Sequence, residues 1–149
     1  MSSRLLLLPV LALAVFLAFA GTHHLRQDLL FTKLDTELSF WGRANYQPTE
    51  ITRAKTATAI ERLLVVSPGN ANYLSLRASQ LAWEGYWAGG DVGAGLDKQA
   101  LAAQERAQQS RPAYGPGWLY LLQYAQTANA GADYDASARE RLNALQRWR

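Results

Sequence analysis

Side chains able to do acid–base or nucleophilic chemistry are scattered along this chain. No serine has a histidine–aspartate pair to activate it, and the adjacent His23 and His24 cannot both face one metal ion from a helix. We therefore predict no catalytic residue, no metal site, no cofactor and no enzymatic activity. A carboxylate pair of the glycosidase type stays open as the least favoured alternative. The carboxylates fall singly at expected helix ends and outer faces, at Glu50, Glu61, Glu84, Glu105 and Asp133.

A glycine-rich insert, residues 88–95, superficially resembles a phosphate-binding loop. Its glycines have the wrong order for a dinucleotide fingerprint, it follows a predicted helix rather than a strand, and no Gly-Lys-Ser/Thr ending is present. Nucleotide binding is therefore not predicted. We expect the insert to be a flexible connection, with Asp97 capping the helix that follows.

Aromatic residues crowd the centre of the chain, where they could bind rather than catalyse. Aromatic faces stack on sugar rings and on peptide prolines, but they also fill hydrophobic cores. Trp83 and Trp118 are expected mainly in the core. Tyr86 and Trp87 adjoin the glycine-rich insert and are expected nearer the surface.

Composition narrows the class of protein further. The 149 residues include 15 Lys and Arg against 12 Asp and Glu, and the charges alternate along the chain. A nucleic-acid-binding protein would gather its basic residues into a stripe, so no nucleic-acid partner is predicted. The chain contains no cysteine, so disulfides and thiolate chemistry are excluded.

Residues 1–22 read as a membrane anchor or signal segment. Arg4 precedes sixteen residues, 5–20, without a charged or polar side chain, and as a helix these would span ~24 Å of the ~30 Å hydrocarbon core. We favour an uncleaved anchor, single-pass in a bacterial inner membrane and inserted through residues 5–22, with the bulk of the chain periplasmic. Alternatively, cleavage after Ala18-Phe19-Ala20 would release a periplasmic protein.

The remainder predicts an all-α protein. Leucines at steps near 3.6 predict a long amphipathic helix over residues 24–46, within a stalk region of residues 23–48 that continues from the anchor. Thr49 is the expected N-cap of the next helix, which ends at Val66. The turn at residues 67–70 stops that helix, and Asn70 is placed to cap the following one.

From residue 71 the spacing resembles a tetratricopeptide repeat. The first helix of such a repeat has large, small, large and glycine residues at fixed positions, and here these are Leu74, Ala78, Leu81 and Gly85. The second helix matches at Ala100, Ala107 and Pro112. The pattern restarts at Trp118 and Leu121. This resemblance implies about six antiparallel helices in stacked hairpins, with residues 49–149 as the repeat domain.

The chain departs from that pattern in two ways. The span between Pro68 and Pro112 is roughly ten residues longer than the family's ~34. Gln104 occupies a position that the family usually fills with a large apolar group. We therefore expect packed helical hairpins rather than a regular superhelix.

The resemblance also implies where a partner would bind. The family commonly uses the inner face lined by the first helix of each pair, and the residues nearest that face are polar but uncharged, which argues against a basic clamp for carboxylates. Together with the central aromatics, the candidate partner-binding residues are Ser75, Ser79, Gln80, Trp83, Tyr86, Trp87, Tyr120, Gln123 and Gln126.

A short anchor, a small repeat domain and a basic last helix resemble accessory proteins of bacterial exopolysaccharide biosynthesis (the VpsP type). That resemblance implies a non-catalytic adaptor or scaffold whose partners are integral membrane proteins of an envelope assembly system. The alternative is a released periplasmic module that binds peptide or glycan, and the second alternative is a cryptic glycan-modifying enzyme.

Overall fold

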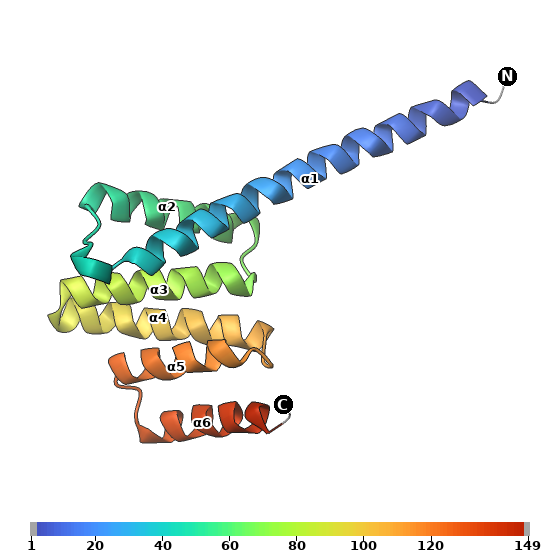
Figure 1. The fold of residues 1–149 in the computed structure, drawn as a ribbon. Helices are drawn as coiled ribbons and strands as arrows, with labels where there is room; N and C mark the ends of the chain where they lie inside the picture. Colours follow the sequence, from blue (N-terminus) through green and yellow to red (C-terminus); the bar gives the residue numbers. More distant parts are fainter. Residues whose placement is uncertain (1–2, 148–149) are drawn as a thin grey trace.

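The computed structural model describes residues 3–147, except for the side chains of residues 3–10, 12, 20 and 23. These residues form six α-helices and one short 3₁₀-helix, and no strand occurs among them, so the all-α prediction is confirmed (Figure 1). The elements are α1 (Ser3–Phe40), η1 (Arg43–Asn45), α2 (Glu50–Val66), α3 (Ala71–Ala88), α4 (Gly90–Ser110), α5 (Gly115–Thr127) and α6 (Ala132–Gln146).

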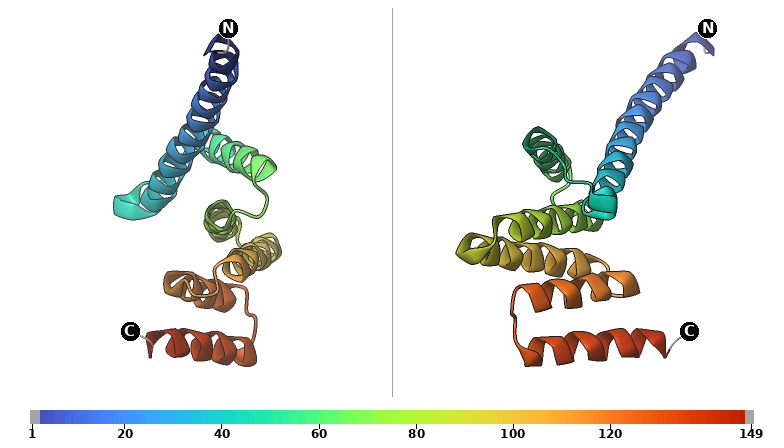
Figure 2. Two further views of the ribbon diagram at one scale, coloured as in Figure 1. Left: turned by 90° about the vertical axis from the view of Figure 1, so that its right-hand side faces the viewer. Right: turned by 60° about the vertical axis from the view of Figure 1, so that its left-hand side comes forward.

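Consecutive helices run in opposite directions, and α3 to α6 are stacked one on the next (Figure 1). The C-terminal half of the long helix α1 lies beside α2 and α3. Its N-terminal half projects away from the rest of the molecule, so the N terminus lies far from α6 (Figure 2). Neighbour-to-neighbour stacking therefore organises the fold.

Helix α1 joins the predicted anchor to the predicted amphipathic helix without a break. The expectation that this helix extends to Tyr46 is wrong, because Gly42 adopts a left-handed backbone conformation at φ 75° and only the 3₁₀ turn η1 follows. Trp41 Nε1 and the Tyr46 hydroxyl both donate to Glu37 Oε1, at 3.0 and 2.9 Å. These bonds hold the turn against the end of α1.

Part of the predicted anchor lies outside the described residues, namely residues 1–2 and the side chains of residues 3–10, 12 and 20. Within what the structure does describe, no helix combines the length and the apolar content that crossing a membrane requires.

The predicted helix caps at Thr49 and Asn70 are confirmed. Thr49 Oγ1 accepts from the backbone N–H of Thr52 at 3.2 Å, and Asn70 Oδ1 accepts from Asn72 N at 2.9 Å and from Tyr73 N at 3.4 Å. Each side chain satisfies backbone donors that have no partner within the helix.

The prediction of a flexible glycine-rich connection is wrong. Only Gly89, at φ 61°, interrupts the helices, and α4 begins at Gly90, so Asp97 lies inside α4 and does not cap it. A β-carbon on Gly93 would lie 2.6 Å from the Gly85 carbonyl oxygen, and one on Gly85 would lie 3.2 Å from the Gly93 carbonyl oxygen. Gly85 and Gly93 therefore let α3 and α4 touch backbone to backbone.

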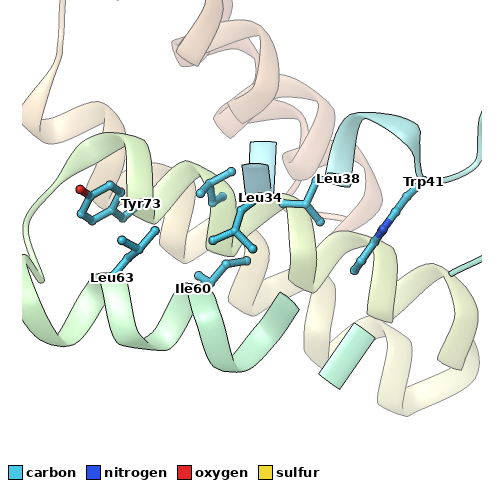
Figure 3. Close-up of a cluster of buried hydrophobic side chains, with 7 residues drawn as sticks. Leu34, Leu38, Trp41, Ile60, Leu63 and Tyr73 are labelled. Carbon is cyan, nitrogen blue, oxygen red and sulfur yellow. The ribbon is translucent and has the colours of Figure 1, made fainter. Parts of the chain in front are cut away.

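The hydrophobic core is divided into clusters that each join neighbouring helices. One cluster joins the C-terminal end of α1 to α2 and α3 (Figure 3), and another, around the fully buried Ala78, joins α3 to α4 and α5. A third joins α5 to α6 around Leu121, Leu122 and Ala138. The first cluster consists of Leu34, Leu38, Trp41, Ile60, Leu63, Tyr73 and Leu76.

Candidate functional site: a groove between alternate helices

The candidate site is a groove bounded by α1, α3 and α5, referred to below as the α1–α3–α5 groove. It consists of two hollows that share Ser79, Tyr120 and Tyr124. The wide hollow, of about 690 Å³, opens between α3, α5 and the turn after α1. The narrow hollow, of about 330 Å³, lies between α1, α3, α5 and the turn from α4 to α5. Side chains from helices far apart in sequence therefore face one space.

The groove brings together most of the residues predicted to bind a partner. Helix α3 presents its candidates at steps of three and four residues, which places them on one side of the helix. Helix α5 adds two more from across the groove. The candidates that line the two hollows are Ser75, Ser79, Trp83, Tyr86, Trp87, Tyr120 and Gln123.

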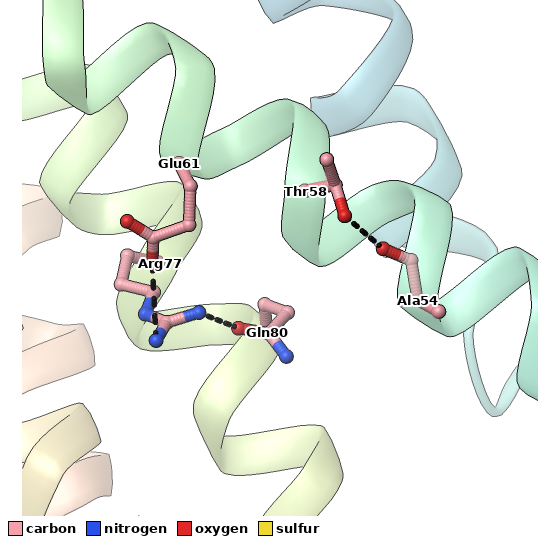
Figure 4. A network of polar contacts seen from close by, with 5 residues as sticks. All are labelled: Ala54, Thr58, Glu61, Arg77 and Gln80. Carbon is pink, nitrogen blue, oxygen red and sulfur yellow. Dashed lines mark hydrogen bonds and ion pairs between the residues drawn. The ribbon is translucent and has the colours of Figure 1, made fainter.

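Two predicted candidates do not line the groove. Gln80 is only 4% exposed, and its Oε1 accepts from Arg77 Nη1 at 2.8 Å. Arg77 also forms an ion pair with Glu61 at 3.1 Å, so Gln80 belongs to the contact between α3 and α2 (Figure 4). Gln126 is exposed on α5 outside either hollow.

Stacked aromatic rings form one wall of the wide hollow. The rings of Trp83 and Trp87 stack at a centroid distance of 5.6 Å, and Tyr86 meets Trp83 edge-on at 5.9 Å. On its inner side the Trp87 ring packs against Trp41 at a centroid distance of 5.2 Å. The Arg53 guanidinium lies 4.9 Å from the centre of the Trp87 ring. The expectation that Trp87 is a surface residue therefore needs correction, because it is partly buried between helices, whereas Tyr86 is 75% exposed.

Tyr124 lies on the floor of the groove, where both hollows meet. It is 7% exposed, and this burial raises its pKa to about 12. The hydroxyl therefore stays neutral at ordinary pH and can both donate and accept hydrogen bonds. Burial also raises the pKa of Asp97, which lines the wide hollow.

The narrow hollow is lined by a positively charged side chain that sequence reasoning missed. Arg111 follows α4, and its Nη1 and Nη2 donate to Asn72 Oδ1 at 2.6 Å and to Ser75 Oγ at 3.4 Å. Its guanidinium also lies 4.6 Å from the centre of the Tyr114 ring. The inner face therefore carries a positive charge, and the prediction that it is uncharged is wrong.

Two buried glutamines one turn apart on α4 place Arg111. Gln108 Nε2 lies within hydrogen-bonding distance of the carbonyl oxygens of Arg111, Pro112 and Tyr114, at 3.0, 3.4 and 3.2 Å. Gln104 Nε2 donates to the Gly117 carbonyl at 3.2 Å. Gln104, the polar residue where the repeat usually has a large apolar one, thus fixes the turn into α5. In the sequence, the pair of glutamines four residues apart on the expected core side of α4 was the pattern that could have indicated this.

A hollow of about 790 Å³, larger than either part of the groove, lies between α4, α5 and α6. Its lining includes Trp118, Leu121 and Leu145, together with Arg141, and contains none of the predicted binding residues. Trp118 Nε1 donates to the Pro112 carbonyl at 2.9 Å, which anchors this side chain to the turn before α5.

Comparison of the chain with protein-family models, with curated proteins and with solved structures found no match.

Proposed function

We propose that this protein is a non-catalytic, membrane-anchored adaptor with tetratricopeptide-like hairpins, which binds a partner in the α1–α3–α5 groove. Its setting is a bacterial envelope assembly system, with the groove on the periplasmic side and exopolysaccharide biosynthesis or export as the process served. The observation that carries the proposal is the gathering of seven predicted binding residues in one groove formed by alternate helices.

The packing supports the repeat interpretation. Ala78 is fully buried where α3 meets α4 and α5, as expected of the small residue at a hairpin crossing. Gly85 contacts the neighbouring helix through its backbone. Each hairpin buries its apolar face against the next one, which is the physical principle of helical repeats.

The first helix supports attachment to a membrane. Between residues 11 and 19, every large apolar side chain that the structure describes is more than half exposed, with Phe19 at 72%. An exposed apolar surface of this kind is costly in water and is relieved by lipid. Residues 5–22 are therefore the proposed anchor, and adjoining integral membrane proteins are the proposed partners.

The groove itself also fits a released periplasmic module that binds glycan or peptide. The stacked wall of Trp83, Trp87 and Tyr86 favours that alternative, because aromatic faces pack on sugar rings and on proline. The two functions differ in whether residues 1–20 are removed.

A crosslinking experiment tests the adaptor proposal. A photoreactive amino acid at Gln123, which lines the groove, should crosslink to an integral membrane protein in intact cells. The same amino acid at Gln126, three residues further along α5 and outside the groove, should give little of that product. Equal crosslinking from both positions, or crosslinking from Gln126 alone, would contradict binding in the groove.

The same samples decide between the two forms of the protein. An adaptor should keep residues 1–20 and should sediment with the membranes. A shortened, soluble product would favour the released module.

A further inference from the structure

We infer that the narrow hollow binds the carboxylate of an acidic saccharide, a uronate, through Arg111, while the aromatic wide hollow receives the neighbouring sugars. This inference rests on the alternative function of the protein as a glycan-binding module, because it assigns a ligand class to the α1–α3–α5 groove.

The first argument is charge. Arginine carries a positive charge, and both hydrogen-bond acceptors of Arg111, Asn72 and Ser75, are neutral. Arg53 and Arg77, by contrast, form ion pairs with glutamates at 2.8 and 3.1 Å. Among the described residues no carboxylate lies within 4.0 Å of Arg111. An anionic ligand would supply the missing counter-charge.

The second argument is unmet hydrogen bonding. Arg111 Nε and Gln104 Oε1 are both buried without a hydrogen-bond partner, and both residues line the narrow hollow. Gln104 is only 1% exposed. Unpaired buried atoms of this kind are unfavourable, so a ligand for which the neighbouring side chains shift to expose them would gain two hydrogen bonds. Nε requires an acceptor and Oε1 requires a donor, and a uronate supplies both, as carboxylate and hydroxyl.

The third argument is the chemistry of the surrounding walls. Three residues with hydroxyl groups, Ser75, Ser79 and Tyr120, line the narrow hollow, and Tyr114 and Tyr124 add aromatic surface. Beyond them the wide hollow offers Trp83 and the exposed Tyr86. Hydroxyl and amide groups beside aromatic faces match a chain of sugars, whereas a bound amphipathic helix would need apolar side-chain pockets.

One carboxylate opposes the ligand. Asp35 on α1 lines the narrow hollow and is exposed to solvent. Its negative charge would repel the carboxylate of the ligand. Replacing Asp35 therefore gives a second test that is independent of Arg111. Because Asp35 lies on the surface, replacing it should not disturb folding.

The test measures binding of three probes to the full chain in uncharged detergent micelles by titration calorimetry. The probes are trigalacturonate, its methyl ester, and a pentapeptide with a free C-terminal carboxylate. We expect trigalacturonate to bind at least about tenfold more tightly than its ester, equivalent to ~1.4 kcal/mol. Raising the ionic strength should reduce that preference, because the ion pair is partly screened.

Variants assign the preference to residues. Arg111→Gln should abolish it, and Arg111→Lys should restore part of it, because lysine keeps the charge but loses the planar fork. Arg106→Gln, which changes an exposed arginine of α4 outside the groove, should leave the preference intact. Asp35→Asn should tighten binding of the acid several-fold and leave the ester unchanged. Thermal melting verifies that each variant is folded.

Several results would overturn the inference. These are equal affinities for acid and ester, a preference that survives in Arg111→Gln, an Asp35→Asn variant indifferent to the acid, and failure of the saccharides to bind. Arg111-dependent binding of the peptide alone would assign the site to peptides and would also overturn it. Crosslinking from Gln123 that persists in any of these cases would leave the proposed function standing, so the two failures are distinguishable.

Discussion

At the scale of single residues, the contact between Gly85 and Gly93 sets how closely α3 and α4 approach. Gly93 faces the backbone of α3, which cannot move aside for a side chain, whereas Gly85 faces the Asp97 carboxylate as well as the backbone of α4. Gly95, two residues further along α4, has no atom within 4 Å of the position that a β-carbon would occupy. Two glycines of one insert therefore have different physical roles.

Gly93→Ala should lower the free energy of unfolding by about 1–2 kcal/mol. Its β-carbon would lie 2.6 Å from the Gly85 carbonyl oxygen, and overpacking of this kind outweighs the gain of up to ~1 kcal/mol in helix propensity. Gly95→Ala is the matched control and should be neutral or stabilising by up to ~1 kcal/mol. Denaturant unfolding of the two variants measures the difference, and equal stabilities would mean that the helices do not touch here.

The buried amides of Gln104 and Gln108 show how a residue can act through a turn. Both lie on the buried side of α4, and their Nε2 groups meet the backbone carbonyls between Arg111 and Gly117. An apolar side chain at either position could not satisfy those carbonyls. The placement of Arg111 therefore depends on α4 as well as on its own turn.

At the scale of elements, α1 is held on α3 by aromatic rings. Trp41, just after α1, is 2% exposed and packs against Trp87. Trp87 in turn stacks on Trp83 and lies under Arg53 of α2. One side chain thus joins three helices, and the wall of the wide hollow is also part of the support for α1.

Trp87→Ala should therefore destabilise the protein, by about 2–3 kcal/mol, which is below the usual range for a fully buried tryptophan because Trp87 is only partly buried. Tyr86→Ala is the control on the same helix. Since Tyr86 is 75% exposed, its loss should change stability by no more than ~0.5 kcal/mol. Thermal unfolding followed by circular dichroism compares the two variants, and an unaltered melting temperature for Trp87→Ala would show that the ring stack does not hold α1 in place.

At the scale of the whole molecule, stability is built from successive local clusters rather than from one central core. The cluster that holds α1 starts near Leu30 and Phe31 and ends at Trp41. The described side chains at residues 11–19 are exposed and contribute little to it. The folded domain and the exposed apolar segment are therefore separable parts of one continuous helix.

Deletion of residues 1–22 should accordingly leave a domain that still unfolds cooperatively, with a melting temperature within a few degrees of that of the full chain. The deleted protein should move from the membrane fraction to the soluble fraction if residues 5–22 are the anchor. Cell fractionation and a melting curve measure both properties. A truncated protein that stays with the membranes would refute the proposed anchor, and one that fails to fold would refute the separation of the two parts.

The sequence alone determined the helical class, the caps at Thr49 and Asn70, both ends of α2 and the start of α3, because hydrophobic period, capping side chains and prolines act over a few residues. The resemblance to a tetratricopeptide repeat and the crowding of aromatic residues also indicated seven residues that line the groove. Only the tertiary structure decided that the glycine-rich insert is helical, since the backbone contact between α3 and α4 favours a helix where glycine propensity does not. Likewise, it placed Gln80 against α2 and Arg111 in the groove, because these placements depend on contacts between helices that no local pattern encodes.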